Sequence, residues 1–499
     1  MIKTVLTINS TKEIGTIAPE IYGQFSEHLG RCVYEGIFVG RDSDIPNTDG
    51  IRNDVVEALK AIRVPVLRWP GGCFADEYHW RDGIGPLEKR RRMVNTNWGG
   101  AVEDNSFGTH EFLNLCERIG CEPYIAVNVG SGTVREAAEW IEYMTASGGS
   151  TLAKLRESNG RREPWRVKYI GIGNESWGCG GSMEPAYYAS EYKKFQQFCK
   201  DYDGNRLYKI ACGPNGDDYN WTRELLSRIN KWHTKAISLH YYTVPNDWEH
   251  KGSATDFDER EYYVTLQKTR LIEEIIDRHL AIMDELDKER EISLIVDEWG
   301  TWYDVEPGTN PGFLYQQNTM RDALAASINL NIFNSRCTRI SMANIAQAVN
   351  VLQAMLLTEG AKLVKTPTYE VFDMYKEHQG SRLVESGIFN TETGTGDVKI
   401  PALSQSVSIK EQEGAKYLTI TVSNASLDED AELEVTLADG AVFDREAKIS
   451  VLTGDMRDCN TFEEPDRVRQ ERRTEIWNGG VRRLTVPACG VASVSCALK

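Results

Sequence analysis

The sequence of 499 residues has no apolar run long enough to span a lipid bilayer. Its N-terminus, MIKTVLTINS, also lacks the apolar core that a signal peptide carries, so we expect a cytoplasmic protein without membrane contact. Positive charge is scarce: 57 Lys and Arg stand against 74 Asp and Glu, a net charge of −17. Because nucleic-acid binding needs a clustered positive field, this balance argues against a polyanionic ligand. The basic runs Lys89–Arg92 and 467–473 are interpreted as solvated loops or subunit contacts rather than nucleic-acid contacts.

Metal-binding patterns are missing as well. The histidines form no HExxH motif and no 2-His-1-carboxylate spacing, and the eleven cysteines include no CxxC pair. We therefore expect no metal and no cofactor. Reduced thiols are the simplest interpretation of an odd number of scattered cysteines in a cytoplasmic protein. His279 lies on the apolar face of a predicted helix and is interpreted as a core residue.

From about residue 20 to 360, short β-type runs alternate with helical stretches. The clearest helix is predicted over Tyr262–Glu289, where apolar residues recur at helical spacing. The β-type runs are apolar without strict alternation, which is typical of parallel strands buried on both faces. Eight such units predict an α/β protein with a (β/α)₈ barrel, assigned to residues 19–365. The eight runs are Ile21–Phe25, Val64–Leu67, Pro123–Asn128, Val167–Ile172, Leu207–Cys212, Ala236–His240, Ile292–Val296 and Arg339–Ala343.

After about residue 380 the pattern changes to strict alternation of apolar and polar residues. Leu418–Ser423 and Glu432–Leu437 alternate in this way, and so do the last residues of the chain. Alternation predicts an antiparallel β-sandwich in which each sheet has one solvent-facing side. We assign residues 366–499 to it, together with the N-terminal strand in residues 1–18, because the barrel count is already complete.

Two of the predicted barrel strands deliver a glutamate at their carboxyl ends. Glu175 follows the run 169–174, and Glu298 follows the run 293–297. The carboxyl ends of barrel strands share one rim, where the active sites of such barrels lie. A neutral and an ionised carboxyl group facing each other are what retaining glycoside hydrolysis requires. Other polar residues expected on this rim are Glu27, His28, Arg68, Trp69, Cys73, Asn128, Asn174, His240 and Tyr242.

Each glutamate also has a less specific interpretation. The GxG in GIGNES occurs in dinucleotide-binding loops, but the third glycine is absent and WGCGG follows in place of a helix. Glu175 could instead be a structural carboxylate that caps its loop. Of the adjacent acids Asp297 and Glu298, only one can face the barrel axis, so we expect the other to form a supporting hydrogen bond. Trp299 and Trp302 offer either a flat surface for a sugar ring or ordinary core packing.

Eight segments carry a resemblance to a known family. They are PEIYGQFSEHLG (19–30), VLRWPGGCFADEYHW (66–80), NSFGTHEF (105–112), IGNE, SLHYY (238–242), VDEW, MANIAQAVNVLQAM (342–355) and KTPTYEVFDMYKEHQG (365–380). In this order they closely resemble the α-L-arabinofuranosidases of glycoside hydrolase family 51. The resemblance implies a (β/α)₈ barrel with a jelly-roll-like sandwich, catalysis with retention and without a metal, and a homo-oligomer, often a hexamer.

The resemblance also implies roles for individual residues. It makes Glu175 the acid/base and Glu298 the nucleophile. The substrate-binding residues that it implies are Asn174 at the sugar 2-hydroxyl, Glu27 at the other hydroxyls, Cys73, Tyr242 and Gln353 lining the sugar subsite, and Trp98 and Trp302 as flanking apolar contacts. Two segments depart from the family pattern. SWGCGG (176–181) replaces the Asp-Gly-Pro-Trp of many members, which leaves the leaving-group preference open, and His110 replaces an Asp, which we interpret as a helix-entry or supporting residue.

The predicted function is the release of terminal arabinofuranosyl units from arabino-oligosaccharides by double displacement. Another retaining glycosidase of the same clan, a β-xylosidase or an endo-glucanase, is the alternative within enzymes. A carbohydrate-binding protein without catalytic activity is the alternative from another class, although it leaves the paired glutamates unexplained. A nucleotide-dependent oxidoreductase is the weakest hypothesis, because its glycine pattern is incomplete.

Overall fold

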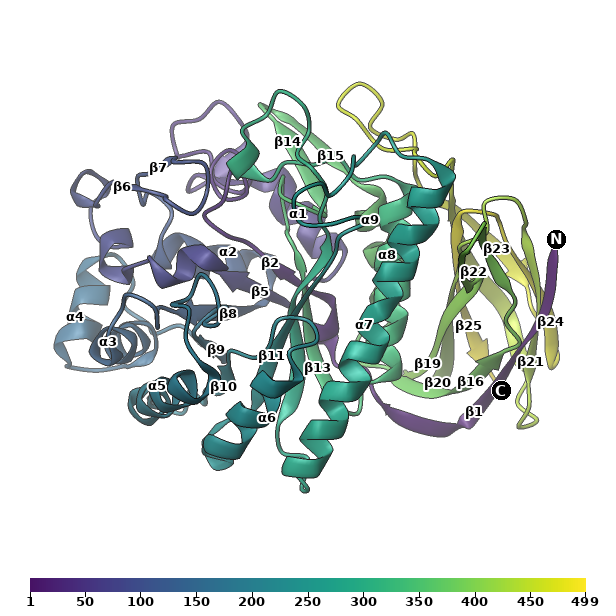
Figure 1. Ribbon diagram of the computed structural model, residues 1–499, viewed down its shortest axis with the longest axis horizontal. Coiled ribbons are helices and arrows are strands. Elements are labelled where there is room, and N and C mark those ends of the chain that lie inside the picture. The colour runs from purple at the N-terminus through teal and green to yellow at the C-terminus, as the bar shows by residue number, and fades with distance from the viewer.

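The computed structural model describes the backbone of residues 1–499 and every side chain except that of Arg445. Its first part is a closed barrel of parallel strands, on the left of Figure 1, in the order β10-β11-β12-β13-β2-β5-β8-β9. These strands are β2 (Gly23–Phe25), β5 (Val66–Trp69), β8 (Glu122–Val127), β9 (Tyr169–Ile172), β10 (Tyr208–Ala211), β11 (Ala236–Thr243), β12 (Ser293–Thr301) and β13 (Ile340–Ala346). Each of the eight β-type runs predicted from the sequence overlaps one of them, so the predicted barrel is confirmed.

Helices follow the barrel strands and form the outer layer. They are α1 (Asn53–Ala61), α2 (Thr109–Ile119), α3 (Val134–Thr145), α4 (Thr151–Ser158), α5 (Pro185–Phe198), α6 (Tyr219–Arg228), α7 (Glu259–Leu286), α8 (Met320–Ser335) and α9 (Pro367–Tyr375). The predicted helix Tyr262–Glu289 corresponds to α7, which begins earlier because Asp258 accepts a hydrogen bond from the backbone N–H of Glu261 and caps the helix. Among the described residues, no helix combines the length and the apolar character that crossing a membrane requires.

Apolar side chains fill the amino-terminal part of the barrel interior and leave its carboxyl end to polar groups. One buried cluster there contains Val66, Tyr124, Tyr169, Ile210, Ala236, Ile295 and Met342. The outward faces of the same strands pack against the helices in a larger cluster. Because both faces of each strand are buried, the strands read as near-continuous apolar runs. The interior is therefore a packed core, and only its carboxyl-terminal rim is available for chemistry.

The second part is a nine-stranded sheet that curls around its own core, on the right of Figure 1. Its strand order is β23-β22-β25-β20-β19-β16-β1-β21-β24. The bounds are β1 (Ile2–Thr16), β16 (Arg382–Ile388), β19 (Leu403–Gln412), β20 (Ala415–Asn424), β21 (Ala431–Leu437), β22 (Phe443–Thr453), β23 (Glu471–Ile476), β24 (Val481–Val486) and β25 (Gly490–Leu498).

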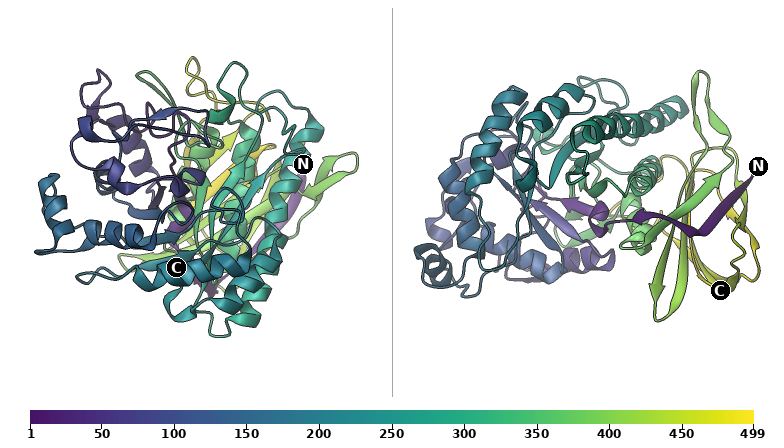
Figure 2. Two further views of the ribbon diagram at one scale, coloured as in Figure 1. Left: turned by 60° about the vertical axis from the view of Figure 1, so that its left-hand side comes forward. Right: turned by 90° about the horizontal axis from the view of Figure 1, so that it is seen from below.

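The N-terminal strand belongs to this sheet, as predicted. β1 pairs with β16 on one side and with β21 on the other, and Figure 2 shows it running from the sandwich to the barrel. Its alternating residues Leu6 and Ile8 are fully buried in the sandwich core. The pairing of β1 with β21 is parallel, so the expectation of a purely antiparallel sandwich is wrong at this strand. A strand that enters from the start of the chain is not bound by the hairpin geometry that makes its neighbours antiparallel.

The expectation of one solvent-facing side per sheet is also wrong where the sandwich meets the barrel. Thr419, Thr421 and Ser423 are the polar residues that alternate along β20, yet all three are buried. Their side of the sheet packs against α8, which is buried over almost its whole surface. Hydrogen bonds replace water at this contact, for example from the Thr421 hydroxyl to Asn331 Oδ1 of α8. Alternation in the sequence therefore marks a polar face here but not an exposed one.

The predicted domain boundary at residue 365 lies just before α9. This helix follows β13 in the chain and packs against α8, as the last helix of a (β/α)₈ barrel does. The sheet of the sandwich is entered again only at Arg382, the first residue of β16. The division into 19–365 and the remainder stays a prediction.

Candidate active site

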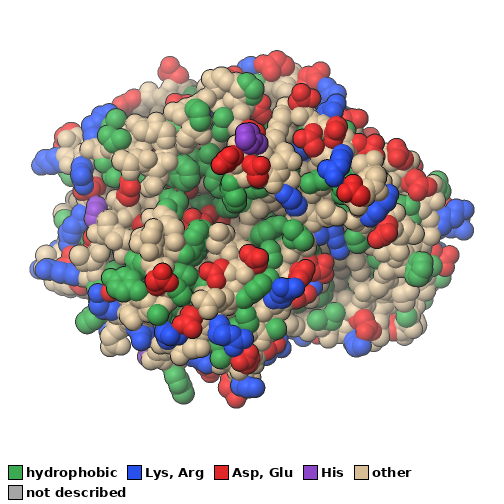
Figure 3. Space-filling view, in the orientation of Figure 1, with side chains coloured by type: hydrophobic (Ala, Val, Ile, Leu, Met, Phe, Trp, Pro, Cys, Tyr) green, Lys and Arg blue, Asp and Glu red, His purple; other side chains and the backbone are tan. Residues whose placement is uncertain are grey.

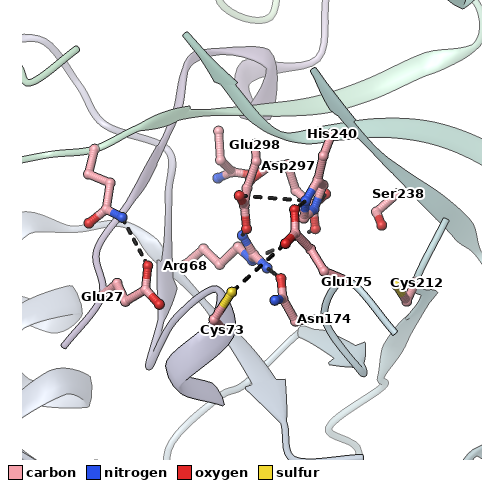
Figure 4. Close-up of polar contacts among 12 residues, drawn as sticks. Glu27, Arg68, Cys73, Asn174, Glu175, Cys212, Ser238, His240, Asp297 and Glu298 are labelled. Atoms are coloured by element: carbon pink, nitrogen blue, oxygen red, sulfur yellow. Dashed lines mark hydrogen bonds and ion pairs between the residues drawn. The ribbon is translucent and has the colours of Figure 1, made fainter. Parts of the chain in front are cut away.

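The polar residues predicted for the rim come together at the carboxyl ends of the barrel strands. Glu298 and His240 lie in the last part of β12 and β11, and Glu175 follows β9. Arg68 lies in β5, and Glu27 follows β2 on the far side of the site (Figure 4). Parallel pairing explains the proximity, because His240 stands opposite Glu298 on adjacent strands, just after a register shift that follows Ser238.

The two predicted catalytic glutamates face each other. One carboxylate oxygen of Glu175 and one of Glu298 lie within 4.8 Å of each other. Glu298 is almost fully buried, whereas about 18% of the Glu175 side chain is exposed, so Glu175 lies closer to solvent. The prediction that distant parts of the chain bring two carboxyl groups to one point agrees with this geometry.

Glu298 accepts two strong hydrogen bonds. Arg68 Nη1 donates to Oε1 at 2.7 Å, and the Tyr242 hydroxyl donates to Oε2 at 2.8 Å. Burial and the neighbouring carboxylate of Glu298 raise the pKa of Tyr242 well above its ordinary value, so the phenol stays neutral and keeps its proton for this bond. Tyr242, predicted as a substrate-binding residue, thus contacts the predicted nucleophile directly.

His240 lies among three carboxyl groups. Its Nδ1 is 2.9 Å from Glu175 Oε1 and 3.5 Å from Glu298 Oε2, and its Nε2 is 3.1 Å from Asp297 Oδ1. Burial opposes the charged imidazolium, but the charge of Glu298 and the bonds to Asp297 and Glu175 outweigh burial and raise the pKa of His240 to about 10. The raised pKa favours the imidazolium form of His240 at neutral pH, in which Nδ1 donates to Glu175 and Nε2 forms an ion pair with Asp297.

The pKa of Glu175 is raised above its ordinary value. Burial is the largest cause, the hydrogen bond from His240 opposes it, and the negative charge of Glu298 adds to it. The residue also has left-handed backbone geometry, with φ of 39°, which is uncommon for a residue with a side chain. Such backbone positions cost energy and occur where the surrounding structure holds them, often at functional sites.

Asp297, next to Glu298, makes the supporting contacts expected of it. The Tyr124 hydroxyl donates to Asp297 Oδ2 at 2.7 Å, and Arg68 Nε lies 3.7 Å from the same oxygen. Arg68 is thereby held between Asp297 and Glu298, with its guanidinium over the ring of Phe25. Both carboxyl groups thus reach Arg68 and His240 inside the barrel, so the expectation that only one of the two acids faces the barrel axis is wrong. The pairing of β11 with β12 shifts register between Ser238 and His240, which interrupts the regular alternation of side chains at this point.

Glu27 forms a second polar centre beside the glutamate pair. The backbone N–H of Phe74 donates to its Oε1 at 3.0 Å, and the indole N–H of Trp98 donates to the same oxygen at 2.9 Å. Gln347 donates to its Oε2 at 3.1 Å. Burial, followed by the charge of Glu298, raises the pKa of Glu27 to about 7. Trp98, predicted as a flanking contact, is thus brought into the site through Glu27.

Asn174 and Trp302 complete the predicted set. Arg68 Nη2 donates to Asn174 Oδ1 at 2.6 Å, which fixes the orientation of the amide. Its NH₂ group is turned to the side of Cys179, where the contact with sulfur is 3.8 Å. The Trp302 ring meets the Tyr242 ring edge-on at 5.0 Å between centroids, and it meets the Trp248 ring edge-on at 5.4 Å. These rings form an aromatic wall beside the nucleophile.

Gln353 is not part of this arrangement, so its predicted place in the sugar subsite is wrong. Its side chain is fully buried and accepts a hydrogen bond from the backbone N–H of Thr301 at 2.9 Å. Its amide N–H groups donate to Asp322 and Thr368, behind the nucleophile strand. Gln347 occupies the position that was expected of Gln353, because Gln347 directly follows β13 whereas Gln353 lies beyond the rim.

Cys73 reaches the site, but not as a free thiol. Cys73 and Cys179 form a disulfide across a sequence separation of 106 residues. The expectation of reduced thiols is therefore wrong for this pair, while the other nine cysteines are free. Barrel topology brings the loops after β5 and β9 near each other, since only β8 lies between these two strands. A pairing set by topology leaves no short-range spacing in the sequence.

The remaining histidines have structural surroundings. His110 lies in the first turn of α2, as predicted, with Nε2 2.6 Å from the Tyr143 hydroxyl, and burial lowers its pKa to about 4. His279 is buried in the core, where it contacts the Thr222 hydroxyl and the Gly216 carbonyl. Both agree with their predicted roles.

Among the described side chains, two groups come close enough to be considered as metal ligands: Glu175, His240 and Glu298, and Cys73, Glu175 and Cys179. In the first group the raised pKa of His240 favours the protonated ring, paired with Glu175 and Asp297, and a protonated imidazole has no lone pair for a metal. In the second group the sulfurs are bonded to each other rather than present as thiolates. The arrangement is that of an acid/base site.

Sequence reasoning missed four functional positions. Arg68 and His240 were expected on the rim but without a role, and Gln347 and Cys179 were not singled out. A signal was present for the first two, since each is a charged or ionisable residue at the end of an apolar strand. Nothing local in the sequence marks Gln347 or pairs Cys179 with Cys73.

The barrel, the polar rim and the facing glutamates together define a glycoside hydrolase. Comparison with known proteins identifies the family. The models "Alpha-L-arabinofuranosidase 1 domain" and "Alpha-L-arabinofuranosidase C-terminal domain" match residues 58–261 and 297–489. The chain is 49% identical, over 98% of its length and 95% of the relative's, to a protein of Bacteroides ovatus named intracellular exo-α-L-arabinofuranosidase. A probable α-L-arabinofuranosidase C of Aspergillus flavus is 32% identical over 95% of this chain and 94% of its own length.

Solved structures give the same result. The family 51 arabinofuranosidase of Xanthomonas axonopodis pv. citri superposes with a TM-score of 0.94 at 43% identity, covering 99% of this chain and all of the other. An arabinose complex of the α-L-arabinofuranosidase of Thermotoga maritima superposes with a TM-score of 0.86 at 31% identity, with the same coverage. The chain belongs to the α-L-arabinofuranosidases of glycoside hydrolase family 51.

Proposed function

We propose that this enzyme removes terminal α-L-arabinofuranosyl units from arabino-oligosaccharides with retention of configuration. The observation that carries the proposal is the approach of Glu175 and Glu298, whose oxygens lie within 4.8 Å. Retaining glycosidases hold their carboxyl groups about 5–5.5 Å apart, whereas inverting ones need about 6.5–9.5 Å to admit a water molecule. The name of the Bacteroides ovatus relative supports exo action on arabinofuranosides.

In this mechanism Glu298 is the nucleophile and Glu175 the acid/base. Glu298 attacks the anomeric carbon while Glu175 protonates the departing oxygen, which leaves a glycosyl-enzyme. The hydrogen bonds from Arg68 and Tyr242 suit a carboxylate that acts as a nucleophile. The raised pKa of Glu175 keeps its proton available for the leaving group.

The second half of the reaction reverses the role of Glu175. Once Glu298 is esterified its negative charge is lost, and with it one of the causes that raise the pKa of Glu175. The ionised Glu175 then accepts a proton from the attacking water, which releases the sugar. His240 contacts Glu175 Oε1 and carries a positive charge that stabilises this ionised form.

The surrounding residues supply contacts for a furanose ring. Because Arg68 occupies Asn174 Oδ1, the Asn174 amide presents its NH₂ group, which we assign to the sugar 2-hydroxyl. Glu27 is assigned to the other hydroxyls, held in place by Trp98 and Gln347. Figure 3 shows a hollow on the barrel half of the molecule, lined by hydrophobic side chains with acidic side chains at its edge.

Substitution of the two glutamates tests the roles. Glu298→Ala should lower kcat/KM by at least about 10⁴-fold on every substrate. Azide should partly restore activity by replacing the nucleophile, and the glycosyl azide formed should have the opposite anomeric configuration. Glu175→Ala should cost about 10²–10⁴-fold on oligosaccharides, whose leaving groups need protonation, and much less on 2,4-dinitrophenyl α-L-arabinofuranoside.

The matched control is Glu249→Ala, an exposed carboxylate on the loop that follows β11, which should act as wild type. NMR of the first product formed gives the stereochemistry. An inverted product, or a Glu175→Ala variant equally impaired on good and poor leaving groups, would contradict the proposal. A panel of nitrophenyl glycosides that includes β-xylosides tests the sugar preference.

We also propose that the enzyme works in the cytoplasm as a homo-oligomer, with a hexamer as the expected size. The name of the Bacteroides ovatus relative, which describes that protein as intracellular, supports the location. The oligomeric state rests on the family resemblance. Size-exclusion chromatography with light scattering measures it directly, and a monomeric mass at micromolar concentration would refute it.

A further inference from the structure

The disulfide between Cys73 and Cys179 joins two loops of the active site. Cys73 lies in the loop after β5, and Cys179 lies in the loop that follows β9 and carries Glu175. Cys179 is exposed and Cys73 is half-buried, so a dissolved thiol can reach the bond. Exposed disulfides are the ones that are reduced most readily.

The disulfide contacts the predicted acid/base. Cys179 Sγ lies 3.4 Å and Cys73 Sγ 3.9 Å from the same oxygen, Glu175 Oε2, as Figure 4 shows for Cys73. The other carboxyl oxygen, Oε1, faces His240. A sulfur in a disulfide carries no hydrogen and cannot donate to Oε2, whereas a free thiol at the same place can.

The disulfide also ties down the turn that places Glu175. The carbonyl of Glu175 accepts hydrogen bonds from the backbone N–H groups of Gly178 and Gly180, which flank Cys179. Glu175 itself is held in left-handed geometry, which needs support from its surroundings. On the other side of the bond, the residue after Cys73 is Phe74, whose N–H donates to Glu27. The cross-link thus connects the acid/base turn to the loop that contacts Glu27.

We propose that Cys179 is a redox-sensitive positioning residue for the acid/base. Joined to Cys73, it fixes the turn of Glu175 and leaves Glu175 Oε2 without a thiol donor. A dithiol reductant breaks the S–S bond in a two-electron exchange: the reductant becomes its cyclic disulfide, and both of its protons pass to the two cysteines. This inference rests on the acid/base role proposed for Glu175.

Reduction has two expected effects. The freed turn no longer holds Glu175 against the leaving group, which lowers kcat more than it changes KM. In addition, a thiol that donates to Oε2 favours the carboxylate form and lowers the pKa of Glu175, since a hydrogen bond to the charged form stabilises it. The upper limb of the pH–rate profile, which reports a required acid, therefore moves to lower pH.

The experiment compares the oxidised and the dithiothreitol-reduced enzyme on an arabino-oligosaccharide and on 2,4-dinitrophenyl α-L-arabinofuranoside. Alkylation under denaturing conditions followed by mass spectrometry should count nine free thiols before reduction and all eleven cysteines after it. Reduction should lower kcat on the oligosaccharide by about tenfold, which is less than the loss expected when the general acid is removed altogether. It should change kcat on the activated substrate by less than about twofold. Reoxidation should restore the first rate.

Variants distinguish the effect of losing the cross-link from the effect of gaining a hydrogen-bond donor near Glu175. Cys179→Ala and Cys179→Ser both lose the disulfide and should no longer respond to dithiothreitol. The serine hydroxyl is a donor near Glu175, so the upper limb of the pH–rate profile should lie at lower pH for Cys179→Ser than for Cys179→Ala. Cys121→Ala, at a half-buried free cysteine, is the matched control and should respond to the reductant as wild type does.

Three outcomes would overturn the inference: eleven alkylated cysteines in the unreduced enzyme, an unchanged oligosaccharide rate after verified reduction, or a Cys179→Ala variant that still responds to dithiothreitol. Failure of the acid/base assignment looks different. In that case Glu175→Ala would impair good and poor leaving groups equally, whatever the redox state.

Discussion

At the scale of single residues, the charges immediately around Glu175 balance when Glu175 itself is protonated. Arg68 and His240 are the two cations, and Asp297 and Glu298 face them as carboxylates. A proton on Glu175 then makes this group neutral, which agrees with the raised pKa of that residue. Neutrality in a buried site avoids the large cost of an unpaired charge.

Gln347 offers a test of the second polar centre. Gln347→Ala removes the hydrogen bond to Glu27 Oε2 and should lower kcat/KM by about 10–100-fold, since a bond to a charged group is worth about 1.5–3 kcal/mol. Most of the loss should appear in KM if Glu27 binds the sugar in ground and transition states alike.

Gln353→Ala is the matched control. It removes contacts behind the nucleophile strand and should lower the thermal unfolding midpoint while the folded enzyme keeps kcat/KM within about threefold. A normal KM for Gln347→Ala together with a raised one for Gln353→Ala would reverse the assignment made from the structure.

The glutamate pair could be predicted from the sequence because each residue ends an apolar strand, and strand ends meet at one rim. The partners of those glutamates could not be predicted to the same extent. Whether Arg68 contacts Glu298 or Asp297 depends on side-chain directions within the barrel, and Gln347 is distinguished from Gln353 only by where the chain goes after β13.

At the scale of elements, the apolar pattern predicts that a strand forms but not what covers it. The alternation along β20 is clear in the sequence, yet its polar face meets α8 rather than water. The apolar residues of α8 do not gather on one face of the helix, which was the available signal that this helix is covered all round. Which surface covers it depends on how barrel and sandwich pack, and no local pattern records that.

β1 allows the contribution of one strand to be measured. Leu6→Ala empties a fully buried position between β16 and β21 and should destabilise the sandwich by about 2–5 kcal/mol. Val5→Ala, at the next residue on the exposed side, should change stability by less than about 0.5 kcal/mol. Thermal unfolding followed by circular dichroism makes the comparison, and equal shifts for the two variants would show that β1 does not pack as described.

At the scale of the whole molecule, His378 lies where barrel and sandwich meet. It contacts the hydroxyls of Ser408 in β19 and Thr421 in β20 at 2.7 and 3.0 Å. Burial lowers its pKa to about 3, so it stays neutral in the folded protein. In the unfolded chain the pKa of this histidine has its ordinary value of about 6.5, so below that pH the unfolded state binds more protons than the folded state does. The contribution of neutral His378 to the free energy of unfolding is therefore fully present above pH 6.5 and is lost progressively as the pH falls toward 3.

His378→Gln tests this coupling. The variant should be less stable than wild type at pH 7, because the packing is altered, but it should lose about 2 kcal/mol less than wild type between pH 7 and pH 5. Urea unfolding at both pH values gives the difference. His250→Gln, at an exposed site, is the matched control and should leave the wild-type difference unchanged. An identical acid loss in His378→Gln would refute the argument.

The position of β1 between β16 and β21 has a consequence for biosynthesis. This strand leaves the ribosome before the barrel, while both of its hydrogen-bonding neighbours are translated after the barrel is complete. The strand of Leu6 and Ile8 therefore has no partner strand while the more than three hundred and fifty residues between β1 and β16 are synthesised. The nascent chain carries an open apolar edge for that whole interval, and this is the stage at which chaperones would find a binding site on it.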